Sequence, residues 1–265
     1  NLTLLSTLSG GAISDAAITR TGGQISGDAL AQRVVGGSSN RNPSGGNDGI
    51  AGAGTLGGDN GWHTLGVPST GGLTGSDLRD ADDGQQIPVE LPDSGGSGTN
   101  TNNSMIFKYD SSSDSYQSPS DLGKNASTIE LGQGEGFILF FFDDNLDSID
   151  DDGFTIEATG TLPSLNSDIS FVDETGSGGD DNRVNVDGSF AFFANPYPSP
   201  YDLSKAKLNG TTLTDRSIEI YEPTGDGGFV TVSPTGMNST GTNVVSPWQG
   251  FFVDVDNLSG TADLV

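Results

Sequence analysis

The stretch GEGFILFFFDDN at residues 134–145 returns in altered form as WQGFFVDVDN at residues 248–257. Three other landmarks return with it in the same order: ISGDALAQRV at 25–34 as LNSDISFVDE at 165–174, WHTLGVPS at 62–69 as FAFFANPYPS at 190–199, and the segment 104–119 as 217–234. An in-order repeat of about a hundred residues indicates two copies of one structural unit. We place the boundary in the acidic stretch 145–153. The predicted copies are 1–150, which contains a Gly-rich loop at 36–60, and 151–265.

Short apolar or alternating runs recur along the whole chain, separated by Gly, Asn, Asp, Ser and Pro. The 41 glycines and 12 prolines are crowded between these runs, where neither residue sustains a helix. Many short strands with frequent turn signals are typical of sandwiches and jelly rolls. We predict an all-β fold with two related, jelly-roll-like β-sandwich units from an internal duplication. The expected strands are 2–5, 29–35, 62–67, 105–109, 137–142, 154–158, 169–172, 190–194, 218–221, 229–232 and 250–255.

Two aromatic runs are candidates for a dry interface between the copies, Phe140–Phe142 and Phe192–Phe193. Gly136 and Gly250 each stand directly before the recurring aromatic run. A glycine at such a position admits a bulge or a close approach of another chain segment.

The charge is strongly negative, with 36 Asp and Glu against 10 Lys and Arg and a formal net charge of −26. Such a field repels phosphate backbones and anionic lipid, so nucleic acid and membrane surfaces are poor partners. No apolar run reaches the length of about 18 residues that predicts a membrane span. Concentrated salt suits this charge, because the Debye length falls to about 3 Å at 1 M. We predict a saline extracellular or cell-surface location, with a calcium-rich exterior as the alternative.

The order of motifs adds a resemblance. FAFFANPYPSPYDL at 190–203, SIEIYEP at 217–223 and VSPWQGFFV at 245–253 together resemble a module common in secreted Bacteroidota-type surface proteins. The region before it in such proteins is similar to the first copy here, with LTLL at 2–5, GDALAQRV at 27–34, GWHTLGVPS at 61–69 and GEGF at 134–137. The resemblance implies export by the type IX secretion route. It implies no catalytic residues.

Catalytic residues are also scarce by composition. His63 is the single histidine and cysteine is absent, so a zinc site of the usual kind lacks its ligands. No second histidine is present to serve a serine nucleophile. Paired carboxylates hydrolyse glycosides in other proteins. With 36 acids, however, pairs at a suitable spacing arise by chance. We predict no enzymatic activity.

The acidic stretch after residue 142 is a candidate calcium site. It contains an Asp-x-Asn-x-Asp core, and calcium prefers about six to eight oxygen ligands. The candidate ligands are Asp143, Asn145, Asp147 and Asp150. The EF-hand pattern fails, because Ser148 holds the place of its glycine and no Glu follows at its last position. The alternative is a solvated acidic connector.

Three aromatic residues are candidates for a sugar-binding face, Tyr197, Tyr201 and Trp248, because flat rings stack on pyranose faces. The alternative is that they pack in the core or at its edge.

Self-assembly is a further class of function. Both ends of the chain, 2–5 and 262–265, are strand-like and favour edge-to-edge pairing with a neighbouring copy. The alternative is that they pair within the chain. We expect a non-enzymatic extracellular structural or adhesive surface protein, a filament or surface-layer subunit whose partner is itself. The alternative is a lectin-like module that binds surface glycans.

Overall fold

The fold is all-β, as predicted. The computed structural model describes residues 2–4, 7–9, 12–14, 28–35, 62–68, 73–80, 89, 104–140, 154–161, 184–185, 188–208, 211–213, 216–222, 228–232, 234, 243–256, 258 and 261–262. The helical elements in these ranges are two single 3₁₀ turns, η1 (Gly75–Asp77) and η2 (Ala126–Thr128). No helix in this part of the chain has the length and apolar character needed to cross a membrane.

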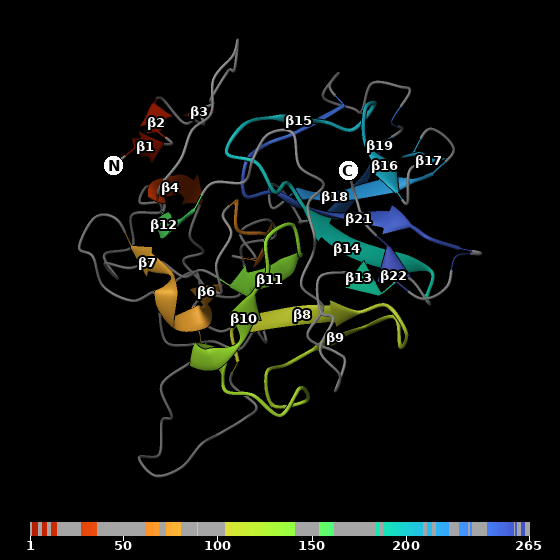
Figure 1. Ribbon diagram of the computed structural model, residues 1–265, viewed down its shortest axis with the longest axis horizontal. Coiled ribbons are helices and arrows are strands. Elements are labelled where there is room, and N and C mark those ends of the chain that lie inside the picture. Colours follow the sequence, from red (N-terminus) through yellow and green to blue (C-terminus); the bar gives the residue numbers. More distant parts are fainter. Residues whose placement is uncertain are drawn as a thin grey trace, which may run out of the picture.

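An N-terminal sheet lies at the left of Figure 1. Its strand order is β1-β4-β12-β7, with β1 parallel to β4 and the other pairs antiparallel. The strands are β1 (Leu2–Leu4), β4 (Asp28–Val35), β12 (Phe154–Thr161) and β7 (Arg79–Asp80). Strand β12 pairs with β4 along its whole length although it follows the boundary placed at 150/151. That division of the chain stays a prediction.

Two further four-stranded sheets have the same strand order. The first is β5-β11-β8-β9, and the second, at the right of Figure 1, is β14-β21-β18-β19. Strands of the first sheet are β5 (Trp62–Leu65), β11 (Phe137–Phe140), β8 (Ile106–Asp110) and β9 (Ser115–Gln117). Those of the second are β14 (Phe190–Ala194), β21 (Gly250–Asp254), β18 (Ile218–Glu222) and β19 (Gly228–Val232).

The registers of these two sheets also correspond. Phe137 stands opposite Leu65 and Lys108, and Phe251 in the second sheet stands opposite Phe193 and Ile220. In the outer hairpins, Tyr109 pairs with Tyr116 as Tyr221 pairs with Phe229. A duplication leads to this expectation, but the duplication itself stays a prediction.

Each of the two sheets packs one face against its own hydrophobic core. The first core joins Leu65, Phe137 and Leu139 to Ile156 of the N-terminal sheet. The second core contains Phe193, Phe251 and Val253, with Leu203 and other residues of the neighbouring turns. Side chains alternate along a strand, so the remaining positions of both sheets point away from these cores. Each sheet therefore has a second face that can pack against the other sheet.

Small two-stranded sheets complete the fold. They pair β2 (Thr7–Ser9) with β3 (Ala12–Ser14), β6 (Leu73–Thr74) with β10 (Glu130–Leu131), β13 (Val184–Asn185) with β22 (Thr261–Ala262), β15 (Tyr201–Asp202) with β20 (Val244–Val245), and β16 (Lys207–Leu208) with β17 (Thr211–Thr212). The terminal strands β1 and β22 therefore both pair within the chain.

Candidate functional site: the junction between two sheets

Three backbone hydrogen bonds among the described residues link the two related sheets. One runs from Gly136 N to Phe192 O at 3.1 Å, and the other two form a reciprocal pair. Gly66 N donates to Trp248 O at 3.0 Å, and Ala194 N donates to Gly134 O at 2.7 Å. Bridges Leu65–Gln249 and Phe193–Glu135 accompany these bonds. In the repeat, Gly66 corresponds to Ala194 and Gly134 to Trp248. The two links are therefore equivalent contacts in which the two sheets exchange roles, as the subunits do in a twofold dimer.

The junction is close enough to require glycine. A Cβ on Gly66 would overlap the Cβ of Ala194, and one on Gly136 would lie 2.5 Å from the Phe192 ring. A Cβ on Gly250 would come within 2.8 Å of the same ring. The close approach predicted for Gly136 and Gly250 is confirmed. The approaching group is the Phe192 ring in both cases, which comes from the other sheet for Gly136 and from the neighbouring strand of the same sheet for Gly250.

Aromatic rings fill one side of the junction. Phe192 and Phe252 stack with their centroids 4.2 Å apart and an interplanar angle of 2°. Tyr109 of the first sheet meets Phe252 edge to face at 4.9 Å, and Tyr116 does so at 6.3 Å. The outer faces of the two sheets therefore meet through rings.

The predicted interface residues divide between faces. Phe192 lies at the junction, whereas Phe193 belongs to the second core and Phe140 to the first. Neighbouring residues of a strand point to opposite faces, so a continuous aromatic run cannot serve one interface. Phe141 and Phe142 lie outside the described residues.

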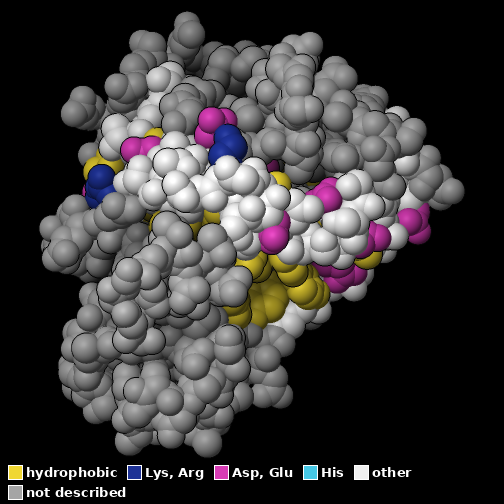
Figure 2. Space-filling view, turned by 90° about the horizontal axis from the view of Figure 1, so that it is seen from below, with side chains coloured by type: hydrophobic (Ala, Val, Ile, Leu, Met, Phe, Trp, Pro, Cys, Tyr) yellow, Lys and Arg dark blue, Asp and Glu magenta, His cyan; other side chains and the backbone are white. Residues whose placement is uncertain are grey.

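The other side of the junction is hollow. Thr64 and Ile138 stand where the second sheet has Phe192 and Phe252, since Thr64 pairs with Ile138 as Phe192 pairs with Phe252. A cavity of about 410 Å³ lies there, with His63 and Thr64 in its wall beside Trp62, Phe107, Tyr116, Ile138, Tyr221 and Phe229. Figure 2 shows apolar side chains gathered in a recess, with acidic side chains close to its border.

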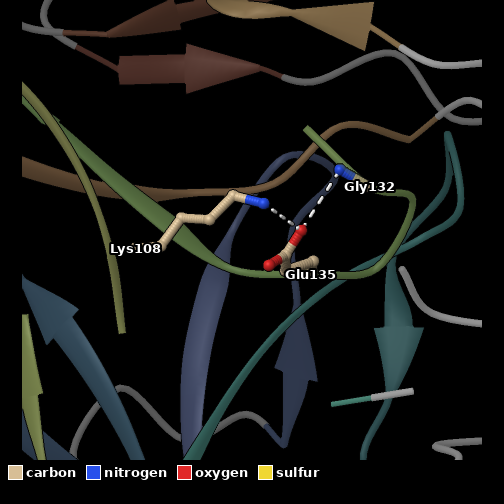
Figure 3. A network of polar contacts seen from close by, with 3 residues as sticks. All are labelled: Lys108, Gly132 and Glu135. Atoms are coloured by element: carbon tan, nitrogen blue, oxygen red, sulfur yellow. Dashed lines mark hydrogen bonds and ion pairs between the residues drawn. The ribbon is translucent and has the colours of Figure 1, made fainter. Parts of the chain in front are cut away.

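A buried ion pair supports the first sheet (Figure 3). Lys108 Nζ lies 2.8 Å from Glu135 Oε2, and the two side chains are 4% and 13% exposed. Gly132 N also donates to Glu135 Oε2, at 3.3 Å. In the second sheet the corresponding residues are Ile220 and Gln249, which carry no charge. Gln249 Nε2 instead donates to Thr64 Oγ1 at 2.7 Å, across the junction.

Trp248 extends from the second sheet into the first core. Its indole is 1% exposed and belongs to the first core, although its neighbours in sequence belong to the second sheet. Its φ of 65° is rare for a bulky residue, and its buried Nε1 has no hydrogen-bond partner. The corresponding Gly134 has a φ of 75°. The position of Trp248 matches the packing role that the sequence offered as the alternative to sugar binding.

Tyr197 and Tyr201 lie together at the edge of the second core. Their ring centroids are 5.6 Å apart with an interplanar angle of 44°, and both rings are partly exposed. Burial, with smaller contributions from Tyr197 and Asp202, raises the pKa of Tyr201. Trp248 packs in the first core instead, so this pair is what remains of the predicted sugar-binding group.

Asn195 holds the turn beneath these tyrosines. Its buried amide Nδ2 donates to Ser199 O at 2.8 Å and to Val245 O at 3.0 Å, while its Oδ1 accepts from Tyr197 N at 2.9 Å. Sequence reasoning missed this role. The signal was the position of an asparagine before two prolines, where few backbone donors are left to close a turn.

Asp114 ties the first hairpin to the start of β14. Its Oδ1 accepts from Ser189 N at 3.1 Å and from the Tyr109 hydroxyl at 3.0 Å. Desolvation pushes the pKa of Asp114 upward, but the hydrogen bonds from Ser189 and Tyr109 outweigh it and hold that pKa below its usual range.

The predicted calcium ligands Asp143, Asn145, Asp147 and Asp150 lie outside the described residues. Within the described ranges, no group of three or more His, Cys, Asp or Glu side chains is placed to hold a metal ion.

Comparison of the chain with family models, with curated proteins and with solved structures finds no match.

Proposed function

We propose that this chain is a non-enzymatic surface module with a structural or adhesive role in a saline extracellular setting. The reciprocal pair of backbone links between the two related sheets carries this proposal. A protein that bears load between a surface and its surroundings needs its parts joined by contacts that resist separation. Backbone hydrogen bonds between buried segments serve this need, because an unpaired buried backbone group is costly.

The side chains at the junction support the same role. Gly66, Ala194 and Gly136 are buried, and the Phe192–Phe252 stack covers the links on one side. Arg33 of the N-terminal sheet adds a further connection, since its Nη1 donates to Pro247 O at 2.6 Å. All three four-stranded sheets are thereby tied to the segment 247–249.

The net charge of −26 favours assembly in salt. Between copies of this chain the repulsion is strong at low ionic strength and short-ranged at high ionic strength. We therefore expect self-association to rise with salt.

Electron microscopy and light scattering of the full chain at about 0.1 M and about 1 M NaCl test this proposal. We expect regular assemblies at the higher concentration. A monodisperse monomer under both conditions would contradict a filament or surface-layer role.

Glycan binding is the second candidate, favoured by the partly exposed contact between Tyr197 and Tyr201. A glycan array with the parent chain and with Tyr201→Leu tests it. Binding that is lost in the variant supports the lectin role, and an array without signal for the parent chain ends it.

Calcium remains part of the proposal through Asp143, Asn145, Asp147 and Asp150. Calorimetric titration with calcium at high ionic strength, repeated on Asp147→Asn, is the direct test. Heat and a rise in melting temperature that vanish in the variant support the site; no heat with the parent chain removes it.

A further inference from the structure

We infer that the cavity between the two sheets binds a small quaternary ammonium compound. This inference does not rest on the proposed structural role. Five aromatic side chains surround the cavity: Trp62, Phe107 and Tyr116 from the first sheet, and Tyr221 and Phe229 from the second. A volume of about 410 Å³ is within the range of small-molecule sites.

The cavity follows from a local difference between the copies. On the filled side of the junction, Phe252 contacts Tyr109 at 4.9 Å and stacks on Phe192. On the hollow side the corresponding partner of Tyr221 is Ile138, and Thr64 replaces the second ring. Two smaller side chains at matching positions leave room for a ligand where the other side holds protein.

Apolar side chains dominate the wall, and its polar groups belong to Trp62, His63, Thr64, Tyr116 and Tyr221. So apolar a wall disfavours ligands that need many hydrogen bonds. None of the described residues in the wall is Asp, Glu, Lys or Arg. Thr64 already accepts Gln249 Nε2 through its hydroxyl at 2.7 Å and its carbonyl at 3.2 Å. A primary ammonium carries three donors that need acceptors, and a sugar carries several hydroxyls. A quaternary ammonium has no N–H group to satisfy.

The charge selects for a cation. A net charge of −26 repels anions and raises the local concentration of cations. The faces of aromatic rings attract a cation through their quadrupole, and recognition of quaternary ammonium groups by several rings is an established use of this attraction. The rim is accessible, since Tyr116 and Phe229 are 42% and 49% exposed.

The test compares choline with 3,3-dimethylbutan-1-ol, its neutral isostere, by calorimetric titration of the full chain. Cation–π attraction predicts that choline binds at least about threefold more tightly than the alcohol. Equal or tighter binding of the alcohol would overturn the cationic preference. No detectable binding of either compound would overturn the site.

Two variants locate the site. Ile138→Phe copies Phe252 and should fill the cavity, so choline binding should fall at least about tenfold. Phe229→Leu removes one ring at a half-exposed position and should weaken choline more than the alcohol. Val244→Ala, at the exposed position of strand β20 and outside the cavity wall, is the control and should bind as the parent does. If Ile138→Phe does not fold, Phe229→Leu still decides: unchanged choline affinity in that variant places the binding elsewhere and overturns the inference.

Discussion

The two related sheets share strand order and register, yet they differ in what fills the same positions. At the junction, Phe192 and Phe252 stand opposite Thr64 and Ile138 in the repeat. The ion pair Lys108–Glu135 of the first sheet corresponds to the uncharged residues Ile220 and Gln249 of the second. The backbone arrangement tolerates both solutions, because the ladder hydrogen bonds are made by main-chain N–H and C=O groups.

The difference shows which positions at the junction can vary. Where the two sheets approach most closely the residues are small, because a Cβ on Gly66 would overlap the Cβ of Ala194. The neighbouring positions vary in size: Thr64 and Ile138 of the first sheet correspond to Phe192 and Phe252 of the second. This difference produces a packed side and a hollow side of the junction. Substitutions that exchange the two solutions therefore test the comparison directly.

The largest effect is expected from Phe192→Thr, which gives the second sheet the residue of the first. Phe192 is 2% exposed and stacks on Phe252, so loss of its ring leaves a cavity. We expect the free energy of unfolding to fall by about 3–5 kcal/mol in urea denaturation. Phe229→Thr, at a half-exposed ring, is the control and should cost much less. A loss below about 1 kcal/mol for Phe192→Thr would mean that the ring is not buried in solution.

Glu135→Gln should cost about 3 kcal/mol, because it leaves the ammonium of Lys108 buried without its partner. Adding Lys108→Ile reproduces the uncharged pair of the second sheet. We expect the double variant to recover most of the lost stability, measured by a double-mutant cycle in urea. Additive losses would show that the two side chains do not interact.

Substitutions at Trp248, where the first sheet has Gly134, distinguish the contribution of side-chain packing from the cost of the positive φ. Trp248→Gly loses a buried indole, worth about 3–5 kcal/mol, but relieves a positive φ that costs about 1–3 kcal/mol. The net loss should be about 2 kcal/mol. Trp248→Phe keeps a ring and removes the unpaired Nε1. It should therefore change the free energy of unfolding, measured by urea denaturation, by less than about 1 kcal/mol. Equal losses for both variants would argue against this division.

The smallest effect is expected from Asp114→Asn, at about 1 kcal/mol near neutral pH. Asparagine tolerates the positive φ of 45° found there, so the change isolates the carboxylate. The folded-state pKa of Asp114 is lowered, so its stabilisation is present above the ordinary Asp pKa of about 3.9 and is lost as pH falls through the folded value. Melting curves of parent and variant should converge at acidic pH. A constant difference across pH would contradict the link.

Much of the fold was predictable from the sequence. Strand β14 has the predicted bounds 190–194, and β11 begins at the predicted Phe137. Short apolar runs bounded by turn residues predict strands, because this local pattern is enough to locate a short strand in the sequence. The correspondence of the two sheets was visible as the order of motifs, before any pairing was known.

The site was less predictable, since it depends on which faces meet. The run FAFFA has apolar residues at every position, so the sequence cannot tell which ring enters the core and which meets the other sheet. The partner of Lys108 is 27 residues away along the chain, and nothing local marks Glu135 among 36 acids. Trp248 was a candidate for sugar binding, with packing as the alternative, but nothing in the sequence placed its indole in the core of the first sheet.

Calorimetric unfolding of the full chain measures whether the junction joins the two sheets into one cooperative unit. We predict a single transition whose van't Hoff and calorimetric enthalpies agree. Two separable transitions, one for each core, would contradict it.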